Sequence, residues 1–272
     1  MPVFTILGAS GFIGSHLIEH LRAAGAECQV PGRDDWTWLG RDAGHVVYCI
    51  GLSADFRSRP WDTMRAHVCR LIDVLDRGCF ESLLYLSSTR IYAGSSDTRE
   101  IATLQASPLV ADDLYNLSKL AGEAACFAHP SPRVRVARLS NVFGRDPGSE
   151  NFLTTVVREA LGGAIVLRTS GLSEKDYVSV QDVGRYLTSI AEGGRERVYN
   201  VASGVNVTNG AIAESLARLT GCAVHVVPGA QTVRFAPIDV SRIQDEFGAA
   251  RDDLVRSLPR LIGQHPTGEQ SP

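Results

Sequence analysis

A tyrosine and a lysine four residues apart, Tyr115 and Lys119 in the stretch YNLSK, carry side chains that together could move a proton. A helix places positions i and i+4 on one face, with Cβ atoms about 5–6 Å apart, so both side chains can reach one ligand. Free tyrosine titrates at about pH 10, and a neighbouring cation lowers the pKa of a phenol. Spacing alone leaves two readings open: a proton-transfer pair, or two polar side chains on a helix surface.

The segments around this pair follow an α/β pattern. Short apolar runs alternate with longer amphipathic stretches, which predicts βαβ units and a Rossmann-like, doubly wound parallel sheet with a small C-terminal α/β lobe. Strands of the sheet are predicted at residues 3–7, 26–30, 45–50, 82–88, 134–139 and 197–203, and helices at residues 12–24, 61–76 and 112–128. The last helix carries Tyr115 and Lys119.

The chain changes character after Phe143, where the Gly/Pro/charged stretch GRDPGSE is typical of a loop that leaves the main sheet. We therefore predict a dinucleotide-binding domain at residues 1–144, to which residues 178–204 return. A small substrate-binding lobe is predicted at residues 145–177 and 205–262, followed by a flexible tail at 263–272. The elements predicted for the lobe are helices at 152–161 and 209–219 and strands at 164–167 and 223–227.

Three glycines stand directly between the first predicted strand and the first predicted helix. Without Cβ atoms, Gly8 permits a tight turn, Gly11 lets a pyrophosphate approach the backbone, and Gly14 permits close packing of helix on strand. The free N–H groups at the helix N-terminus would then face the phosphates. The alternative is a purely structural turn, but the flanking strand and helix favour a dinucleotide site. Its expected lining is Gly8, Ser10, Gly11, Phe12, Ile13 and Gly14.

The end of the second strand bears on the choice of dinucleotide. An acidic residue is expected about 20 residues after the glycine turn, where it would hold the adenosine ribose. Gly32 occupies that position and Arg33 follows it, which removes a carboxylate that would repel a 2′-phosphate and adds a cation to bind one. NADP is therefore favoured over NAD. Asp34 and Asp35 would serve NAD if the strand ended later, so NAD stays open.

The chain up to about Asn200 contains five blocks in a fixed order: GASGFIG, YLSSTRIYAG, YNLSK, RLSNVFG and KDYVSVQDVG. In the order and approximate spacing of these blocks, the chain resembles the extended short-chain dehydrogenases/reductases, the NAD(P)-dependent epimerase/dehydratase family. The resemblance implies that Tyr115 exchanges a proton with a substrate oxygen while hydride moves between nicotinamide and the carbon that bears it. Lys119 would be the cation that favours the phenolate, and would also hydrogen-bond the nicotinamide ribose.

The family pattern S-x-x-x-Y, counted back from Tyr92, selects Ser88 as the hydroxyl that holds the substrate carbonyl. Thr89 is the second candidate. Taken alone, both hydroxyls are most simply explained as strand-end groups that form turn bonds. The remaining cofactor lining is expected at Ile50, Gly51 and Leu52. His67 stands where relatives often have Asn, and we expect it to pack or to lie on a helix surface rather than to transfer protons.

The neighbours of these residues bear on the reaction. Thr89, Arg90 and Ile91 include no carboxylate, whereas family dehydratases carry an acidic pair there, so 4,6-dehydration is disfavoured. Two catalytic readings stay open. One is NADP-dependent reduction of a keto group on a nucleotide-activated (deoxy)sugar with Tyr115 as proton donor, and the other is epimerisation with tightly bound NAD. A third reading is a non-catalytic NADP-binding sensor, although such relatives typically lose the Tyr/Lys pair.

The resemblance places a nucleotide-diphospho-sugar between the two domains, with Asn141 on its diphosphate. A capping or turn role is an equally good explanation of this Asn. Relatives usually have Arg where this chain has Lys175, which cannot make the Arg fork to phosphate. The expected substrate contacts are Ser88, Thr89, Tyr115, Asn141 and Lys175.

The composition argues against several kinds of partner. A formal net charge of -3 over 272 residues, without a basic stripe, argues against nucleic acid. No apolar run approaches the ~20 residues that span a bilayer, and the six cysteines form no C-x-x-C pair, so neither a membrane nor a metal is expected. A cytoplasmic location suits such thiols. The resemblance implies a homodimer through the YxxxK helix, and the apolar residues that would join the interface, or pack on the sheet instead, are Leu71, Val74, Leu75, Leu120 and Ala124.

Overall fold

The computed structural model describes residues 1–52, 55–146 and 150–264, and most of the predicted tail at 263–272 lies outside them. The largest sheet in this part of the chain has six strands, and all neighbours in it pair in parallel. Their spatial order is β2 (Glu27–Gln29), β1 (Val3–Leu7), β3 (His45–Tyr48), β4 (Ser82–Ser88), β5 (Val134–Leu139) and β9 (Val198–Val201). The predicted parallel sheet is confirmed, including the return of the chain at β9.

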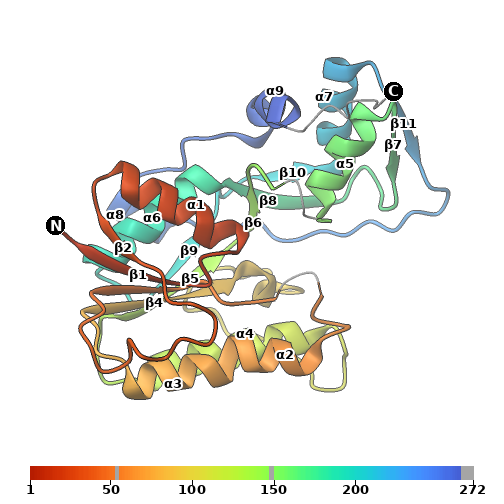
Figure 1. Cartoon of the computed structure of the whole chain (residues 1–272). Helices are drawn as coiled ribbons and strands as arrows, with labels where there is room; N and C mark the ends of the chain where they lie inside the picture. Colours follow the sequence, from red (N-terminus) through yellow and green to blue (C-terminus); the bar gives the residue numbers. More distant parts are fainter. Residues whose placement is uncertain (53–54, 147–149, 265–272) are drawn as a thin grey trace.

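Helices cover both faces of this sheet (Figure 1). One face carries α1 (Phe12–Ala23), α6 (Val180–Gly193) and α8 (Ser241–Phe247), and the other carries α2 (Pro60–Met64), the π-helix η1 (Arg65–Cys69), α3 (Arg70–Arg77) and α4 (Asp113–Ala128). Strands between two helical layers are buried on both sides, which is why they read as continuous apolar runs. Ile6, Val47 and Leu84, for example, are fully buried.

A smaller lobe lies to one side of the main sheet, at the upper right of Figure 1. Its sheets are β10 (Asn206–Thr208), β8 (Glu174–Ser179) and β6 (Asn141–Phe143), and β11 (Ala223–Val226) with β7 (Ala164–Leu167). They pack with α5 (Phe152–Leu161), α7 (Asn209–Thr220) and α9 (Leu254–Gln264). The lobe has its own hydrophobic core, in which Val157 and Leu216 are buried.

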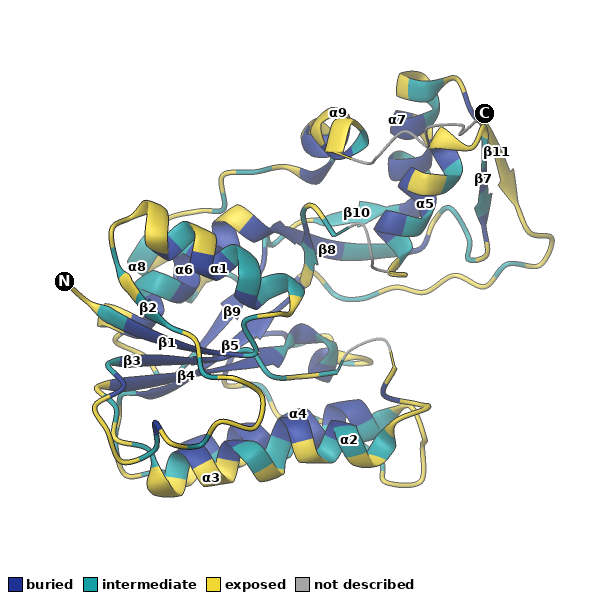
Figure 2. Ribbon diagram, in the orientation of Figure 1, coloured by how far each residue is buried: buried dark blue, intermediate teal, exposed yellow. Residues whose placement is uncertain are grey.

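Two segments differ from the predicted division of the chain. Residues 205–262 were expected in the lobe, but α8 packs on the main sheet, where Ile243 joins the main core and Arg185 donates to the Phe247 carbonyl at 2.9 Å. Phe143, expected in the main domain, is buried in the core of the lobe. Figure 2 shows buried residues on the inner sides of both lobes. A segment therefore belongs to the domain whose hydrophobic core its apolar side chains join, whatever its position in the sequence.

The crossover from β2 to β3 is shortened, in agreement with the short sequence between Arg33 and His45. Residues 30–44 form turns and contain no helix. Trp36 is half-buried, whereas Trp38 is buried in the core beneath this segment. The part of the molecule where an adenosine would be expected is therefore a loop next to a strand of only three residues.

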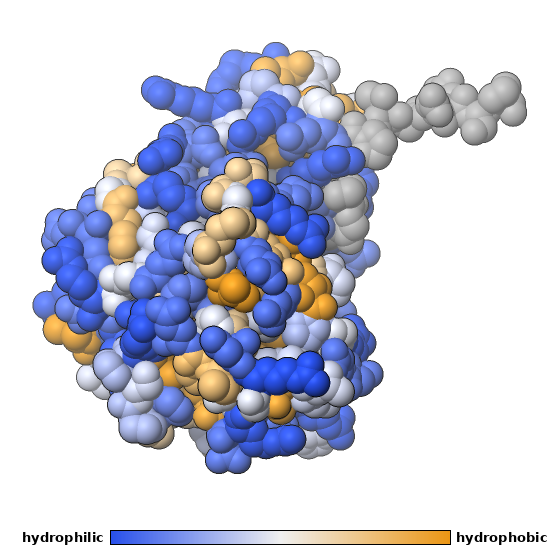
Figure 3. All heavy atoms as spheres, turned by 60° about the vertical axis from the view of Figure 1, so that its left-hand side comes forward, coloured by the Kyte–Doolittle hydropathy of each residue, from blue (hydrophilic) through white to orange (hydrophobic). Residues whose placement is uncertain are grey.

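None of the helices formed by residues 1–52, 55–146 and 150–264 is long and apolar enough to cross a bilayer. In the same residues, no three His, Cys, Asp or Glu side chains cluster as metal ligands would. On the face shown in Figure 3, hydrophilic residues dominate and hydrophobic residues form small separate groups.

Candidate functional site

The hydroxyls of Ser88 and Tyr115 meet at the carboxyl end of β4, where open α/β sheets bind their ligands. Ser88 ends the strand and caps the short helix η2 (Thr89–Tyr92), because its Oγ accepts a hydrogen bond of 3.2 Å from the Arg90 N–H. The Tyr115 side chain, which α4 presents from the other side, lies close enough to Ser88 for the Ser88 hydroxyl to lower its pKa. Thr89, the second candidate, is buried. Of the two, Ser88 is the hydroxyl placed beside the tyrosine.

Three features of its environment set the pKa of Tyr115. Burial raises this pKa, while the nearby Ser88 hydroxyl and the positive charge of Arg90 lower it, and the pKa stays raised overall. Only 8% of Tyr115 is exposed, so the burial effect is large. The phenol therefore keeps its proton at neutral pH, which suits it to donate that proton.

Lys119 lies one helical turn after Tyr115, but its ammonium points to a different partner. Nζ donates a 2.8 Å hydrogen bond to the carbonyl of Leu86 and lies 5.9 Å from the centroid of the Tyr115 ring. Burial lowers its pKa to about 7, against the opposing charge of Glu123. We expected Lys119 to be the cation that lowers the Tyr115 pKa. In the structure that cation is Arg90, because the β4 carbonyl holds the lysine.

A buried ion pair behind α4 accounts for the charge next to Lys119. Glu123 follows Lys119 by one turn and accepts hydrogen bonds from Arg138 of β5, the shortest 2.6 Å long. The side chains are 3% and 4% exposed, respectively. Arg138 also donates to the Tyr92 hydroxyl at 2.6 Å. This network joins α4 to the sheet, and the acid four residues after Lys119 on an apolar helix was the signal that could have revealed it.

His67 is a site residue whose role the sequence analysis missed. It is fully buried in the π-helical turn, so the expected surface position is wrong and the expected packing role holds. Its Nε2 accepts the Leu52 N–H at 3.2 Å, and its Nδ1 lies 2.8 Å from Ser118 Oγ, which donates to the Tyr115 carbonyl at 2.7 Å. Burial and the Lys119 charge lower its pKa to about 2, so the ring is neutral. It ties the strand-end segment to the helix that carries Tyr115.

The glycine turn has the backbone form that a dinucleotide cradle needs. Gly8 has φ +85°, and a Cβ there would stand 2.8 Å from the carbonyl carbon of Cys49. A Cβ on Gly14 would clash with the Gly8 carbonyl. The N-cap of α1 is Gly11, with no side-chain cap and no acidic residue in the first turn, so nothing competes with a phosphate for its N–H groups.

The other predicted cofactor residues lie around this turn. Ser10 is exposed, Phe12 begins α1, and Ile13 packs against the main core. Ile50, Gly51 and Leu52 follow β3. A Cβ on Gly51 would stand 3.1 Å from His67 Nε2 and 3.6 Å from Lys119 Nζ. The residues present thus fit a dinucleotide whose nicotinamide end lies toward Tyr115.

The loop after β2 distributes its charges unevenly. Arg70 of α3 donates to the Arg33 carbonyl at 3.2 Å and to Asp34 Oδ1 at 3.3 Å. Asp35 accepts two hydrogen bonds from Thr37. Both acidic side chains are thus engaged by neighbours, whereas the exposed Arg33 side chain forms no ion pair with any described residue.

Two of the predicted substrate contacts, Asn141 and Lys175, belong to the lobe. Asn141 opens β6 and donates to the Asp176 carbonyl at 2.9 Å, so a structural role for it is real. Lys175 is half-buried on β8. Arg90, which the sequence analysis treated only as a missing carboxylate, has its Cζ 5.5 Å from the centroid of the Tyr115 ring. Its charge also acts on Lys175 of the lobe.

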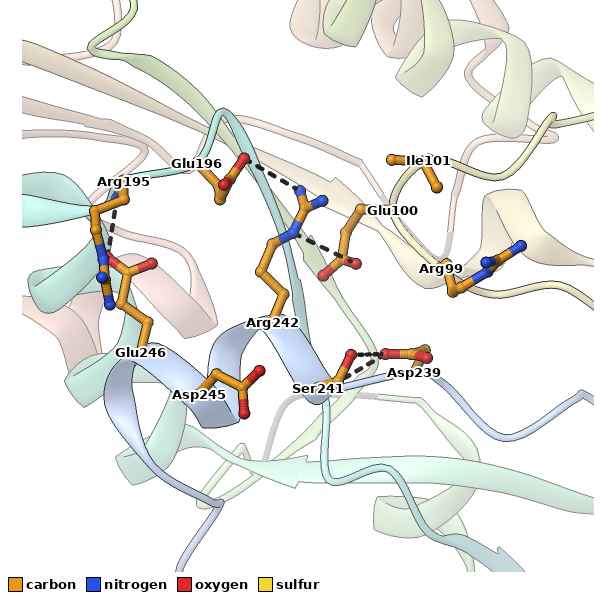
Figure 4. Close-up of a pocket in the computed structure, with 10 residues that line it drawn as sticks. All are labelled: Arg99, Glu100, Ile101, Arg195, Glu196, Asp239, Ser241, Arg242, Asp245 and Glu246. Atoms are coloured by element: carbon orange, nitrogen blue, oxygen red, sulfur yellow. Dashed lines mark hydrogen bonds and ion pairs between the residues drawn. The ribbon is translucent and has the colours of Figure 1, made fainter.

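A pocket of about 430 Å³ lies elsewhere, beside β9 and α8 (Figure 4). Its charges are mostly paired with one another. Arg195 lies 3.4 Å from Glu246, and Figure 4 shows Arg242 between Glu100, at 3.8 Å, and Glu196, at 4.0 Å. None of the predicted site residues lines it. We therefore place the functional site at the end of β4 and not here.

The fold and this site define an NAD(P)-dependent enzyme of the short-chain dehydrogenase/reductase type. The chain belongs to the NAD dependent epimerase/dehydratase family, whose pattern matches residues 4–202. The resemblance noted from the five sequence blocks is thereby confirmed.

Two relatives are named as reductases. The chain is 26% identical over 263 residues to the GDP-6-deoxy-D-mannose reductase of Pseudomonas aeruginosa, which covers 85% of the chain and 84% of the relative. It is 25% identical over 279 residues to the dTDP-4-dehydro-6-deoxy-D-allose reductase of a Streptomyces species, covering 85% and 83%.

Solved structures share the fold over nearly the whole chain. The structure of RMD from Pseudomonas aeruginosa with NADPH has a TM-score of 0.80 at 21% identity, and the two chains cover 96% and 99% of each other. MoeE5 with UDP-glucose and NAD has a TM-score of 0.79 at 23% identity, with 97% and 98% covered. At these identities the likeness shows the fold alone.

Proposed function

We propose that this protein reduces a keto group on a nucleotide-activated sugar with NADP(H). One observation carries the proposal: the hydroxyls of Ser88 and Tyr115 lie together at the end of β4, where burial favours the protonated tyrosine. When bound, the reduced nicotinamide supplies a hydride to the carbonyl carbon. Ser88 then donates a hydrogen bond to the carbonyl oxygen, and Tyr115 gives up its proton as negative charge develops there.

The choice of NADP(H) rests on the loop after β2. Arg33 has no carboxylate partner among the described residues, whereas Asp34 is bound by Arg70 and Asp35 by Thr37, so Arg33 is the cation available to a 2′-phosphate. Among the solved neighbours, RMD carries NADPH and MoeE5 carries NAD, so the preference rests on this loop.

Reduction is favoured over epimerisation by the raised pKa of Tyr115, since an epimerase must first take a proton from the sugar hydroxyl. Both named relatives are reductases of deoxysugars. The intact Ser88 and Tyr115 pair argues against a sensor without turnover. Epimerisation remains the second candidate, because the same residues would serve it if NAD stayed bound.

The test follows NADPH oxidation with a panel of nucleotide-linked keto sugars that includes 4-keto-6-deoxy sugars. The proposal predicts NADPH-dependent turnover by protein that is purified without tightly held cofactor. An epimerase would instead retain its cofactor through purification and interconvert two sugars with no net oxidation. Binding of NADPH without turnover of any keto sugar would favour a sensor.

We also propose that the chain forms a homodimer through α3 and α4. Leu71 and Val74 lie in the core and leave only the outer surface of these helices for a partner. That surface includes Ile72, which is 48% exposed, and Ala124, which is exposed too. Light scattering on a size-exclusion column tests the dimer, and Ile72→Glu should shift it toward monomer.

A further inference from the structure

Arg90 stacks its guanidinium on two aromatic rings at the candidate site. Its Cζ lies 5.5 Å from the centroid of the Tyr115 ring and 5.0 Å from that of Phe56. Both rings are buried. A guanidinium stacked on aromatic rings keeps the N–H groups at its edge free to bind a ligand.

No carboxylate among residues 1–52, 55–146 and 150–264 forms an ion pair with Arg90. The nearby Asp112 is held by Arg57 through two hydrogen bonds of 2.6 and 2.7 Å. Lys175 adds a second positive charge, and the charge of Arg90 lowers the Lys175 pKa beyond the effect of burial. Like charges in a partly buried region repel each other, and an anion bound to Arg90 would offset that cost.

We propose that Arg90 binds a carboxylate on the sugar, near the carbon whose oxygen meets Tyr115 and Ser88. The substrate would then be a nucleotide-linked uronic acid derivative rather than a neutral deoxysugar. This inference depends on the proposed function only in taking the ligand to be a nucleotide sugar. A carboxylate matches the planar fork of a guanidinium.

The position of Arg90 separates this carboxylate from the diphosphate. Arg90 stacks on Tyr115 itself, the residue proposed to meet the reacting oxygen. The residues that resemblance assigns to the diphosphate, Asn141 and Lys175, lie on strands β6 and β8 of the lobe. We therefore assign Arg90 to the sugar.

The experiment measures equilibrium binding, by calorimetry in saturating NADP⁺, of two matched pairs of ligands. They are UDP-glucose with UDP-glucuronic acid, and GDP-mannose with GDP-mannuronic acid, so the members of each pair differ only at carbon 6. In at least one pair the acidic member should bind about tenfold or more tightly than the neutral one, as expected for a charge-assisted pair. Arg90→Gln should reduce this ratio to about one.

Two further variants control the result. Arg57 also stacks on Phe56, with its Cζ 4.5 Å from the ring centroid, but its guanidinium is held by Asp112. Arg57→Gln should leave the ratio unchanged. Arg90→Lys keeps the charge but loses the fork, so it should give an intermediate ratio, and it serves as the test if Arg90→Gln does not fold.

Equal affinity for both members of both pairs in the wild-type protein would overturn the inference. So would a failure of both acidic ligands to bind, or an equal loss for UDP alone and for UDP-glucuronic acid in Arg90→Gln, which would assign the arginine to the diphosphate. Turnover is not needed for this measurement. The expected ratio, together with no reduction of any keto sugar in the NADPH assay, would contradict the proposed function and leave the carboxylate site standing.

Discussion

The cofactor side and the substrate side of the site differ in how they treat charge. On the cofactor side, His67 is neutral and Lys119 Nζ donates to a backbone carbonyl, so these polar groups have protein partners. On the substrate side, Arg90 is stacked on rings and, within the described residues, has no carboxylate partner. The polar groups on the cofactor side are thus satisfied within the protein. On the substrate side, we propose that a carboxylate of the substrate pairs with Arg90.

The largest effect is expected where the two sides meet. Tyr115→Phe removes the proton donor and should lower kcat about a thousandfold, as general acid catalysis contributes on the order of 10² to 10⁴. The dissociation constant of NADPH should not change, because the glycine turn is untouched. The matched control is Tyr85→Phe, since the Tyr85 hydroxyl is buried without a hydrogen-bond partner among the described residues. Steady-state kinetics that show full turnover in Tyr115→Phe would remove this residue from the mechanism.

The next largest effect concerns the cofactor side alone. Gly8→Ala forces a Cβ toward the Cys49 carbonyl carbon at a positive φ, and should weaken NADPH binding roughly a hundredfold, or about 3 kcal/mol. Gly25→Ala is the control, because Gly25 has φ +81° but nothing within 4 Å of its Cβ. Fluorescence titration with NADPH measures the dissociation constant of each variant. Equal losses in both variants would mean that backbone strain, and not the cradle, explains the effect.

These two regions also differ in how far the sequence predicts them. The parallel sheet and the glycine turn were predicted because buried parallel strands leave long apolar runs and a phosphate cradle demands glycine at fixed positions. Ser88, which only the family pattern distinguished from Thr89, lies beside Tyr115 in the structure, and its predicted contact with the substrate carbonyl stays a prediction.

The remainder depends on side-chain directions that a sequence does not contain. Arg90 was noted as a missing acid, since nothing in TRIY shows that its side chain turns onto the rings of Phe56 and Tyr115. Lys119 was assigned to Tyr115 by spacing, but the Leu86 carbonyl lies closer to its ammonium. The π-helical turn that buries His67 likewise has no sequence signature. Contacts over long separations in the chain decided each of these cases.

A smaller effect is expected at the adenosine end of the cofactor side. Arg33→Ser should weaken NADPH binding about tenfold to thirtyfold and leave NADH binding unchanged, because only NADPH carries the 2′-phosphate. Arg41→Ser, an exposed arginine in the same loop, should have no such effect. Titration of each variant with both cofactors checks this. If Arg33→Ser weakens the binding of both cofactors equally, Arg33 does not bind the 2′-phosphate.

The smallest effect concerns the stability of the folded protein. Burial lowers the Lys119 pKa to about 7, whereas the unfolded chain keeps the ordinary value, so the unfolded state binds more protons between pH 7 and about 10. Stability should therefore rise with pH in this window, by at most about 1.4 kcal/mol per pH unit. Lys119→Met removes the buried charge and should flatten this rise in urea denaturation. An equal slope in the variant and the wild type would show that Lys119 does not titrate there.

We propose that a dinucleotide held by the glycine turn lies beside Tyr115 at the end of β4, where the tyrosine donates a proton to a sugar carbonyl. The most direct test uses NADPH deuterated at the transferable position of the nicotinamide, with neutral and acidic nucleotide-linked keto sugars. We expect one deuterium on the former carbonyl carbon of the reduced sugar, detected by mass spectrometry and NMR. With Tyr115→Phe, no deuterium should be transferred. Cofactor that binds but passes no deuterium to any of these sugars would contradict this proposal.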